Sequence, residues 1–146
     1  MPSPYVSNYG ITTVTASTTL TAAAHAGQTI VVNAAAGATI TLPDATGSGN
    51  RYDITTIADQ TGDLVIAVPD ADNTMQGVAY LGNDAAGASC FYTADTSDTV
   101  TLNGTTTGGL KGARVELVDV AANTWNVMVY SEASGTEATP FSAAVS

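Results

Sequence analysis

The strongest constraint on the fold is an alternation of apolar and polar residues with a period of two, which recurs in short segments along the chain. Successive side chains of a β-strand point to opposite faces, so this alternation predicts half-buried strands. Thr, Val, Ile and Tyr dominate the segments, and these residues suit a pleated surface. The predicted strands are residues 10–16, 28–33, 39–42, 51–57, 64–68, 75–80, 88–93, 99–103, 113–120 and 124–130.

Turn-forming residues separate these segments. Gly, Asn, Asp and Pro occur in pairs such as Pro43-Asp44, Gly82-Asn83, Asn103-Gly104 and Gly108-Gly109. Short strands with turns about every 8–12 residues are typical of sandwiches and barrels. We therefore expect an all-β fold, a compact antiparallel β-sandwich or barrel that is jelly-roll-like or β-tulip-like, with an extended N-terminal arm.

One pattern of strand and turn residues occurs twice, over residues 39–68 and 99–129. Each copy begins with Thr-(Ile/Val)-Thr-Leu, continues through a Thr-Gly pair and an arginine, and closes with alternating apolar residues. The closing residues are Leu64, Ile66 and Val68 in the first copy, and Trp125, Val127 and Val129 in the second. The pattern suggests an internal duplication. Trp125, Val127 and Val129 are predicted to anchor the core or a subunit interface, rather than to form a sugar-stacking platform.

Composition favours a structural protein over a nucleic-acid binder. Only 11% of residues are charged, against about 25% in ordinary domains, so hydroxyl and amide groups must supply most of the surface polarity. The net charge is −10, with three basic residues, whereas phosphate backbones require clustered Lys and Arg. The acidic residues occur singly, which indicates a solvated face that suits a basic or neutral protein partner.

No catalytic constellation is evident. His25 and Cys90 are single residues of their kinds, too few for a tetrahedral zinc site, and no nucleophile elbow accompanies them. Cys90 is predicted to be a small buried hydrophobe, and His25 an exposed or hydrogen-bonded residue in a loop or at a strand edge. Nearby acidic residues, as at Asp70 and Asp72, are expected to form turns rather than a calcium site. We expect no enzymatic activity, no cofactor and no metal.

The ends of the chain differ from its middle. Residues 1–10 are predicted to be an N-terminal arm, residues 11–131 a single β domain, and residues 132–146 a C-terminal tail. Neither a secretory signal nor an apolar stretch long enough for a bilayer is present, so a soluble protein made in a cytoplasm is expected. An arm of this kind can add a strand to a neighbouring sheet.

Several segments resemble small structural proteins of tailed bacteriophage virions. Ser97 to Gly109 reads SDTVTLNGTTTGG, and Lys111-Gly112 and a predicted hairpin reaching Trp125 follow it. Residues 135–142, GTEATPFS, are similar to the ending of the same group, and TLPDATGSG at 41–49 is similar to modules of phage heads and tail fibres. These motifs consist of strand and turn residues, so they point to a β-module family.

The resemblance implies a head decoration (cement) protein, bound to the outer surface of a capsid built from an HK97-like major capsid protein. It implies a homo-oligomer, with a trimer favoured over a dimer, and contact with neither nucleic acid nor membrane. An N-terminal arm that docks on the capsid would here involve Tyr5, Val6, Tyr9 and Ile11. Two alternatives stay open: a phage head-fibre or tail-fibre component with a receptor-binding role, and a carbohydrate-binding β-sandwich.

Overall fold

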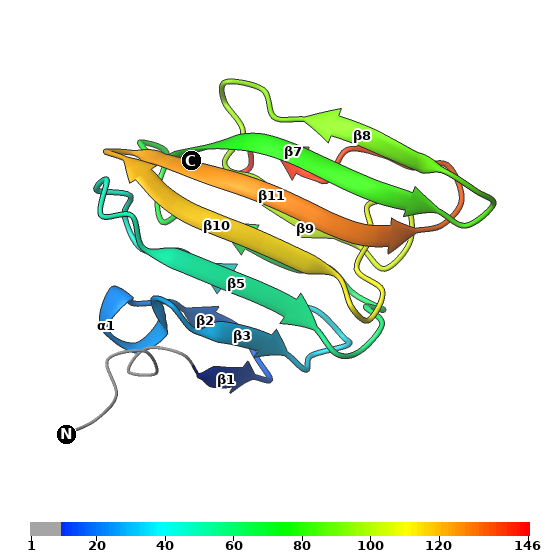
Figure 1. Ribbon diagram of the computed structural model, residues 1–146, viewed down its shortest axis with the longest axis horizontal. Helices are drawn as coiled ribbons and strands as arrows, with labels where there is room; N and C mark the ends of the chain where they lie inside the picture. Colours follow the sequence, from blue (N-terminus) through cyan, green and yellow to red (C-terminus); the bar gives the residue numbers. More distant parts are fainter. Residues whose placement is uncertain (1–9) are drawn as a thin grey trace.

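The computed structural model describes residues 10–146 and shows an all-β sandwich of two packed sheets (Figure 1). One sheet has seven strands, in the order β1 (Ile11–Val14), β3 (Thr29–Val32), β5 (Arg51–Thr56), β10 (Arg114–Ala121), β11 (Thr124–Ala133), β7 (Thr74–Asn83) and β8 (Ala88–Tyr92). The other has five, in the order β12 (Phe141–Ser142), β9 (Thr99–Leu102), β6 (Leu64–Ala67), β4 (Ala38–Thr41) and β2 (Thr18–Thr19). As far as residues 10–146 show, each sheet has two open edges, so the fold is a sandwich and not a closed barrel.

All ten strands predicted from the alternation are present, with shifted ends. β7 and β11 are longer than predicted and run to Asn83 and Ala133. The two-residue strands β2 and β12 were not predicted, because two residues show no periodicity. The one-turn helix α1 (Ala22–His25) was also missed; Thr21 begins it, and its side chain accepts a hydrogen bond from the Ala24 amide.

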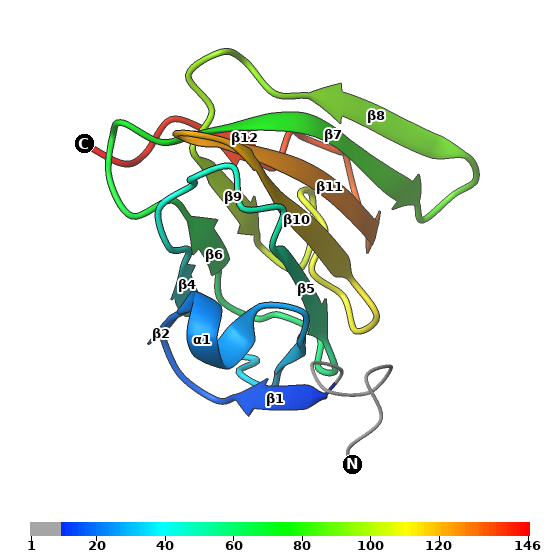
Figure 2. The same ribbon diagram turned by 60° about the vertical axis from the view of Figure 1, so that its left-hand side comes forward.

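The expectation of antiparallel sheets is wrong for half of the sandwich. β1, β3 and β5 are parallel neighbours, and so are β2, β4 and β6. β7 also runs parallel to β11. The reason lies in the connections, because from β1 to β6 the chain alternates between the two sheets. Each strand therefore lies beside the previous strand of its own sheet and runs in the same direction. Figure 2 shows this coil of strands in the lower part of the molecule.

Apolar residues from both sheets form one core. In the seven-stranded sheet a row of inward residues runs through paired positions of five strands: Ile30, Ile54, Val115, Val129 and Ala79. Trp125, Val127 and Val129 are fully buried within the chain itself, and the Trp125 ring meets Tyr52 edge to face at a centroid distance of 5.5 Å. Of the two roles expected for these three residues, the structure shows the core.

The two copies of the repeated pattern correspond only in part. Their opening strands, β4 and β9, both lie in the five-stranded sheet, and the strands that follow, β5 and β10, lie next to each other in the seven-stranded sheet. The closing strands differ, because β6 belongs to the five-stranded sheet and β11 to the seven-stranded one. Leu64 and Trp125 are therefore not equivalent positions.

The C-terminal residues belong to the domain instead of forming a separate tail. β12 pairs with β9, and Phe141 is buried in the common core. The Asp98 carboxylate accepts hydrogen bonds from the amides of Ala144 and Val145. The predicted boundary at residue 132 is wrong for this reason. The predicted arm, residues 1–10, lies outside the described residues except for Gly10.

Candidate functional site

The charged side chains are segregated along the sequence. All thirteen acidic and all three basic residues occur from Asp44 onward. Residues 10–43 form β1, β2, α1, β3 and β4, which lie together at one end of the sandwich (Figure 2). Below, residues 10–43 are termed the uncharged end and residues 44–146 the acidic body. The acidic residues occur singly, but they are confined to residues 44–146, and a count of charge by position reveals this asymmetry.

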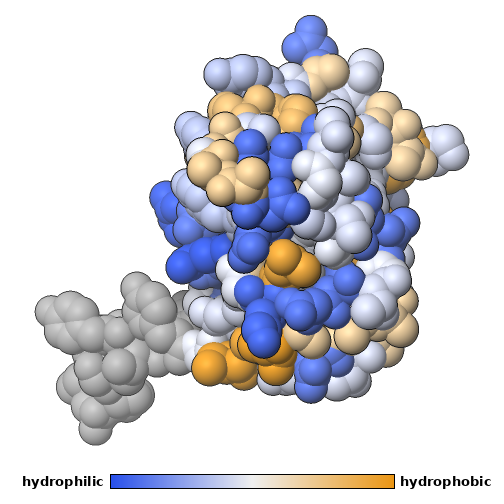
Figure 3. Space-filling view, turned by 90° about the vertical axis from the view of Figure 1, so that its right-hand side faces the viewer, coloured by the Kyte–Doolittle hydropathy of each residue, from blue (hydrophilic) through white to orange (hydrophobic). Residues whose placement is uncertain are grey.

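The uncharged end exposes an apolar residue on a sheet edge. Ile11 begins β1, the edge strand beyond β3, and 73% of its surface is exposed. Figure 3 shows apolar residues at the level of β1, beneath a band of hydrophilic ones. The polar side chains at this end are hydroxyls, amides and the imidazole of His25, and hydroxyls and amides bind water less strongly than charges do. This end is therefore easier to remove from water than the acidic body.

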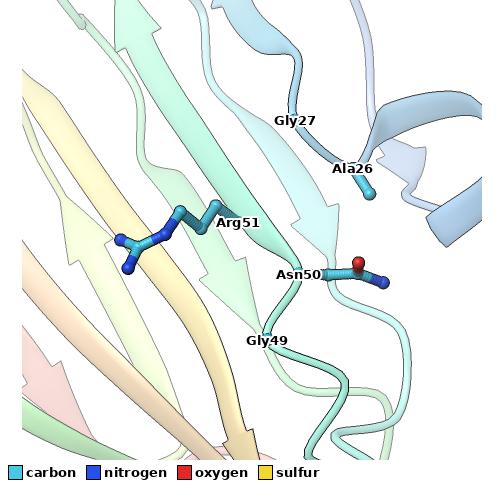
Figure 4. A pocket seen from close by; sticks show the side chains of 5 residues that line it. All are labelled: Ala26, Gly27, Gly49, Asn50 and Arg51. Carbon is cyan, nitrogen blue, oxygen red and sulfur yellow. The ribbon is translucent and has the colours of Figure 1, made fainter. Parts of the chain in front are cut away.

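A shallow hollow lies where the uncharged end meets the acidic body. Ala26 and Gly27 line it on one side, and Gly49, Asn50 and Arg51 on the other (Figure 4). The Arg51 side chain points away from the Ala26 side, while that of Asn50 points toward it. The volume of the hollow is about 230 Å³, which is below the roughly 300–1,000 Å³ of small-molecule sites. The hollow is thus a gap between two packed segments, residues 26–27 and residues 49–51. A hydrogen bond from the Gly27 amide to the Arg51 carbonyl joins the same two segments.

Asp119 is the most heavily hydrogen-bonded carboxylate among the described residues. It lies in β10 and accepts hydrogen bonds from the amides of Thr46, Gly47 and Ser48 and from the hydroxyls of Thr46 and Ser48. Burial acts to raise the pKa of Asp119, but these hydrogen bonds outweigh it and the net pKa is lowered. A carboxylate with this many donors holds a loop in place and is not a general base.

Three tyrosines gather on the outer face of the seven-stranded sheet. Tyr80 and Tyr130 are paired residues of β7 and β11, and their rings stack at a centroid distance of 5.9 Å. Tyr92 on β8 is 73% exposed. Next to Tyr130 in register is Arg114, which forms an ion pair with Asp53. Tyr80, Tyr92 and Tyr130 are termed the tyrosine patch below.

The tyrosine patch was not among the predicted site residues. Two of the tyrosines alternate with buried residues in their strands, as Leu81 follows Tyr80 and Val129 precedes Tyr130, whereas the neighbours of Tyr92 in β8 are only partly buried. Period two alone therefore places Tyr80 and Tyr130 on the outer face, but not Tyr92, which shares a face with Cys90, the residue expected inside. The sequence does not show that β7, β8 and β11 are neighbours, so it could not bring the three together.

The other predicted residues lie apart from one another. Tyr5, Val6 and Tyr9 fall outside the described residues, which leaves Ile11 as the described member of the expected docking set. Cys90 is exposed, so the prediction of a buried hydrophobe is wrong: β8 is an edge strand, and Cys90 faces outward from it. His25 lies in α1 rather than in a loop or strand edge, and its Nδ1 accepts a hydrogen bond from the Thr21 amide.

Acidic residues in the turns bind the protein's own backbone. Asp70 accepts hydrogen bonds from the Asp72 amide and the Asn73 side chain, and Asp59 accepts one from the Lys111 amide. Over residues 10–146, no group of three or more His, Cys, Asp or Glu side chains is placed to hold a metal ion. The same residues contain no helix long and apolar enough to span a membrane. Comparison with protein-family models, with curated proteins and with solved structures finds no match to this chain.

Proposed function

We propose that this protein is a non-enzymatic structural protein of a phage virion, a decoration protein that binds the outer surface of the head and stabilises adjacent capsomers. The observation that carries the proposal is the division into an uncharged end and an acidic body. A protein with a net charge of −10 repels other acidic surfaces, except where its charges are absent. Attachment to a larger assembly requires one end that can be covered by a partner and a charged remainder that stays in water.

Ile11 and the open edge of β1 supply the contact in this proposal. Among residues 10–146, β1 pairs only with β3, so its other side can accept a strand or a loop of the capsid protein. Ile11 adds apolar area that is removed from water on binding. Each contact is small, but a head lattice repeats it many times, and the resulting avidity holds neighbouring capsomers together.

Ile11→Asp tests the attachment. We expect the variant to fold normally, because Ile11 is exposed, and to lose binding to heads that lack the protein, because a charge is placed on the face that must leave water. Val120→Asp is the matched control, since Val120 is also an exposed apolar residue but belongs to the acidic body. Co-sedimentation with heads measures both. Equal binding by both variants would contradict the assigned face.

A second experiment tests the cementing role itself. Purified heads with and without the protein are compared for survival under heat and low salt. Heads that lack it should release their DNA at lower temperature, and adding the purified protein should restore them. If both kinds of head survive equally, the protein decorates the head without stabilising it, and the cementing part of the proposal is wrong.

The tyrosine patch favours a second candidate function, that of a carbohydrate-binding β-sandwich. Exposed aromatic rings on one face are the feature that such a protein needs, and Tyr92 offers a largely free ring. Tyr80 and Tyr130 turn one ring face toward each other, which reduces the area open to a sugar. A glycan array probed with the protein and with Tyr92→Ala decides the matter: binding that disappears in the variant supports this candidate, and no binding excludes it.

A further inference from the structure

Strand β8 carries an unpaired row of backbone groups. It lies at the end of the seven-stranded sheet and, within the part of the chain that the structure describes, pairs only with β7. The Asn83 amide donates to the Gly87 carbonyl, and the Thr93 amide donates to the Gly77 carbonyl. Odd-numbered residues of this segment therefore bond to β7. In an antiparallel ladder the intervening residues point the other way, so Ala88, Cys90 and Tyr92 direct their N–H and C=O groups to the open edge.

This edge lacks the protection that natural sheets place on exposed strands. Such protection consists of very short strands, charged residues or proline. β2 and β12, at the edges of the other sheet, have two residues each. β8 has five, and residues 85–94 contain no charged residue and no proline. Two copies, each with a net charge of −10, repel each other. The edge of β8 belongs to the acidic body, but a second copy that approaches it meets no acidic side chain along the strand.

We propose that two copies of this chain associate through β8, antiparallel and about a two-fold axis at Cys90. In this register Cys90 faces its own counterpart, and Ala88 of each copy faces Tyr92 of the other. Cys90 is the central residue of the strand, so the register pairs every outward backbone group of Ala88, Cys90 and Tyr92. Two seven-stranded sheets become one continuous sheet.

The tyrosine patch supports the same arrangement. Tyr92, Cys90 and Tyr80 lie on the outer face at the β8 side of the sheet, where Tyr80 is the register partner of Cys90. Pairing at β8 brings the patches of two copies together into one surface across the axis. Small side chains at Ala88 and Cys90 leave room for the exposed Tyr92 ring of the facing strand. A pair of this kind is a dimer, unlike the trimer that the resemblance implies, and it does not depend on the capsid role.

Solution mass and thiol cross-linking test the proposal. We expect the purified protein to show twice the 14.6 kDa of one chain. Mild oxidation should yield a Cys90–Cys90 disulfide, because the Cα atoms of facing residues in a hydrogen-bonded antiparallel pair lie about 5.5 Å apart, within the range of about 4.4–6.8 Å that a disulfide spans. Higher salt should strengthen the pair, since Asp84 and Asp95 border the strand and repel across the axis. Cys90→Ser combined with Thr13→Cys moves the thiol to the opposite edge, and should not cross-link.

Ala88→Asp distinguishes this interface from any other. The added carboxylate faces Tyr92 of the second copy in both halves of the pair, so we expect the dissociation constant to rise by about tenfold or more. Val120→Asp, with the same change of charge away from β8, should leave it unchanged. A monomer at all concentrations would overturn the proposal, and so would a trimer, or a dimer that neither cross-links through Cys90 nor responds to Ala88→Asp.

Discussion

Asp119 in β10 accepts a 2.6 Å hydrogen bond from the amide of Gly47, a residue 72 positions earlier in the sequence. The contact ties the connection between β4 and β5 to the hairpin of β10 and β11. The Gly49 amide adds a bond to the Asp119 carbonyl, and the Asn123 amide adds one to the carbonyl of Ala45. The loop is therefore fixed by long-range contacts as well as by its own turn residues.

Replacing Asp119 by alanine should destabilise the fold. The change leaves three amides and two hydroxyls without their acceptor in a partly buried place, so we expect a loss of about 2–3 kcal/mol in the free energy of unfolding. Asp72→Ala is the control, because Asp72 is exposed and should change stability by less than about 0.5 kcal/mol. Urea denaturation measures both variants. Similar midpoints for the two would show that the Asp119 contacts do not stabilise the fold.

The same carboxylate should give stability a dependence on acid. The folded-state pKa of Asp119 is lowered, so its contribution is complete above the unfolded-state pKa of about 3.9 and is lost as pH falls through the lower folded-state value. Asp119→Asn carries no titrating group at this position. We expect the difference in melting temperature between the wild type and Asp119→Asn to be constant at neutral pH and to shrink below about pH 4. A difference that stays constant into strong acid would contradict the lowered pKa.

Gly104 is expected to tolerate no side chain. Its φ is +81°, and a Cβ placed there would lie 1.8 Å from the backbone carbonyl oxygen of Gln60. Gly112 also has a positive φ, +92°, but a Cβ there would have no neighbour within 4 Å. Gly112→Ala should therefore show only backbone strain, about 1–2 kcal/mol, and Gly104→Ala clearly more. Thermal melting of the two variants separates steric overlap from strain, and equal losses would rule out the overlap.

The docked C-terminus makes Phe141 a structural residue. Its ring is buried in the core, and β12 pairs with β9. Phe141→Ala should lower the free energy of unfolding by about 3 kcal/mol, the usual loss for a buried aromatic ring. Phe141→Leu should lose less, because it retains apolar volume. Chemical denaturation of both variants measures this, and an unchanged Phe141→Ala midpoint would show that the C-terminal residues do not support the domain.

The positions of the long strands, and the inward side of most of them, follow from the alternation of apolar and polar residues. Alternation is a local property, since the side chains of any strand point to opposite faces. Leu117 in β10, and Trp125 and Val127 in β11, could therefore be assigned to the inward face of their own strands without knowing which strands lie beside them. Each is buried. The segregation of charge was also present in the sequence, although only a count by position reveals it.

Which strands are neighbours became clear only from the three-dimensional arrangement of the chain. Strand order depends on contacts between distant segments, and the same alternation fits parallel and antiparallel pairing equally well. For this reason the parallel coil of β1 to β6 was not foreseen. Cys90 was expected inside because its local sequence is apolar, yet it is exposed because β8 lies at a sheet edge. Phe141 looked like part of a loose tail, yet it is buried because β9 is available to pair with β12.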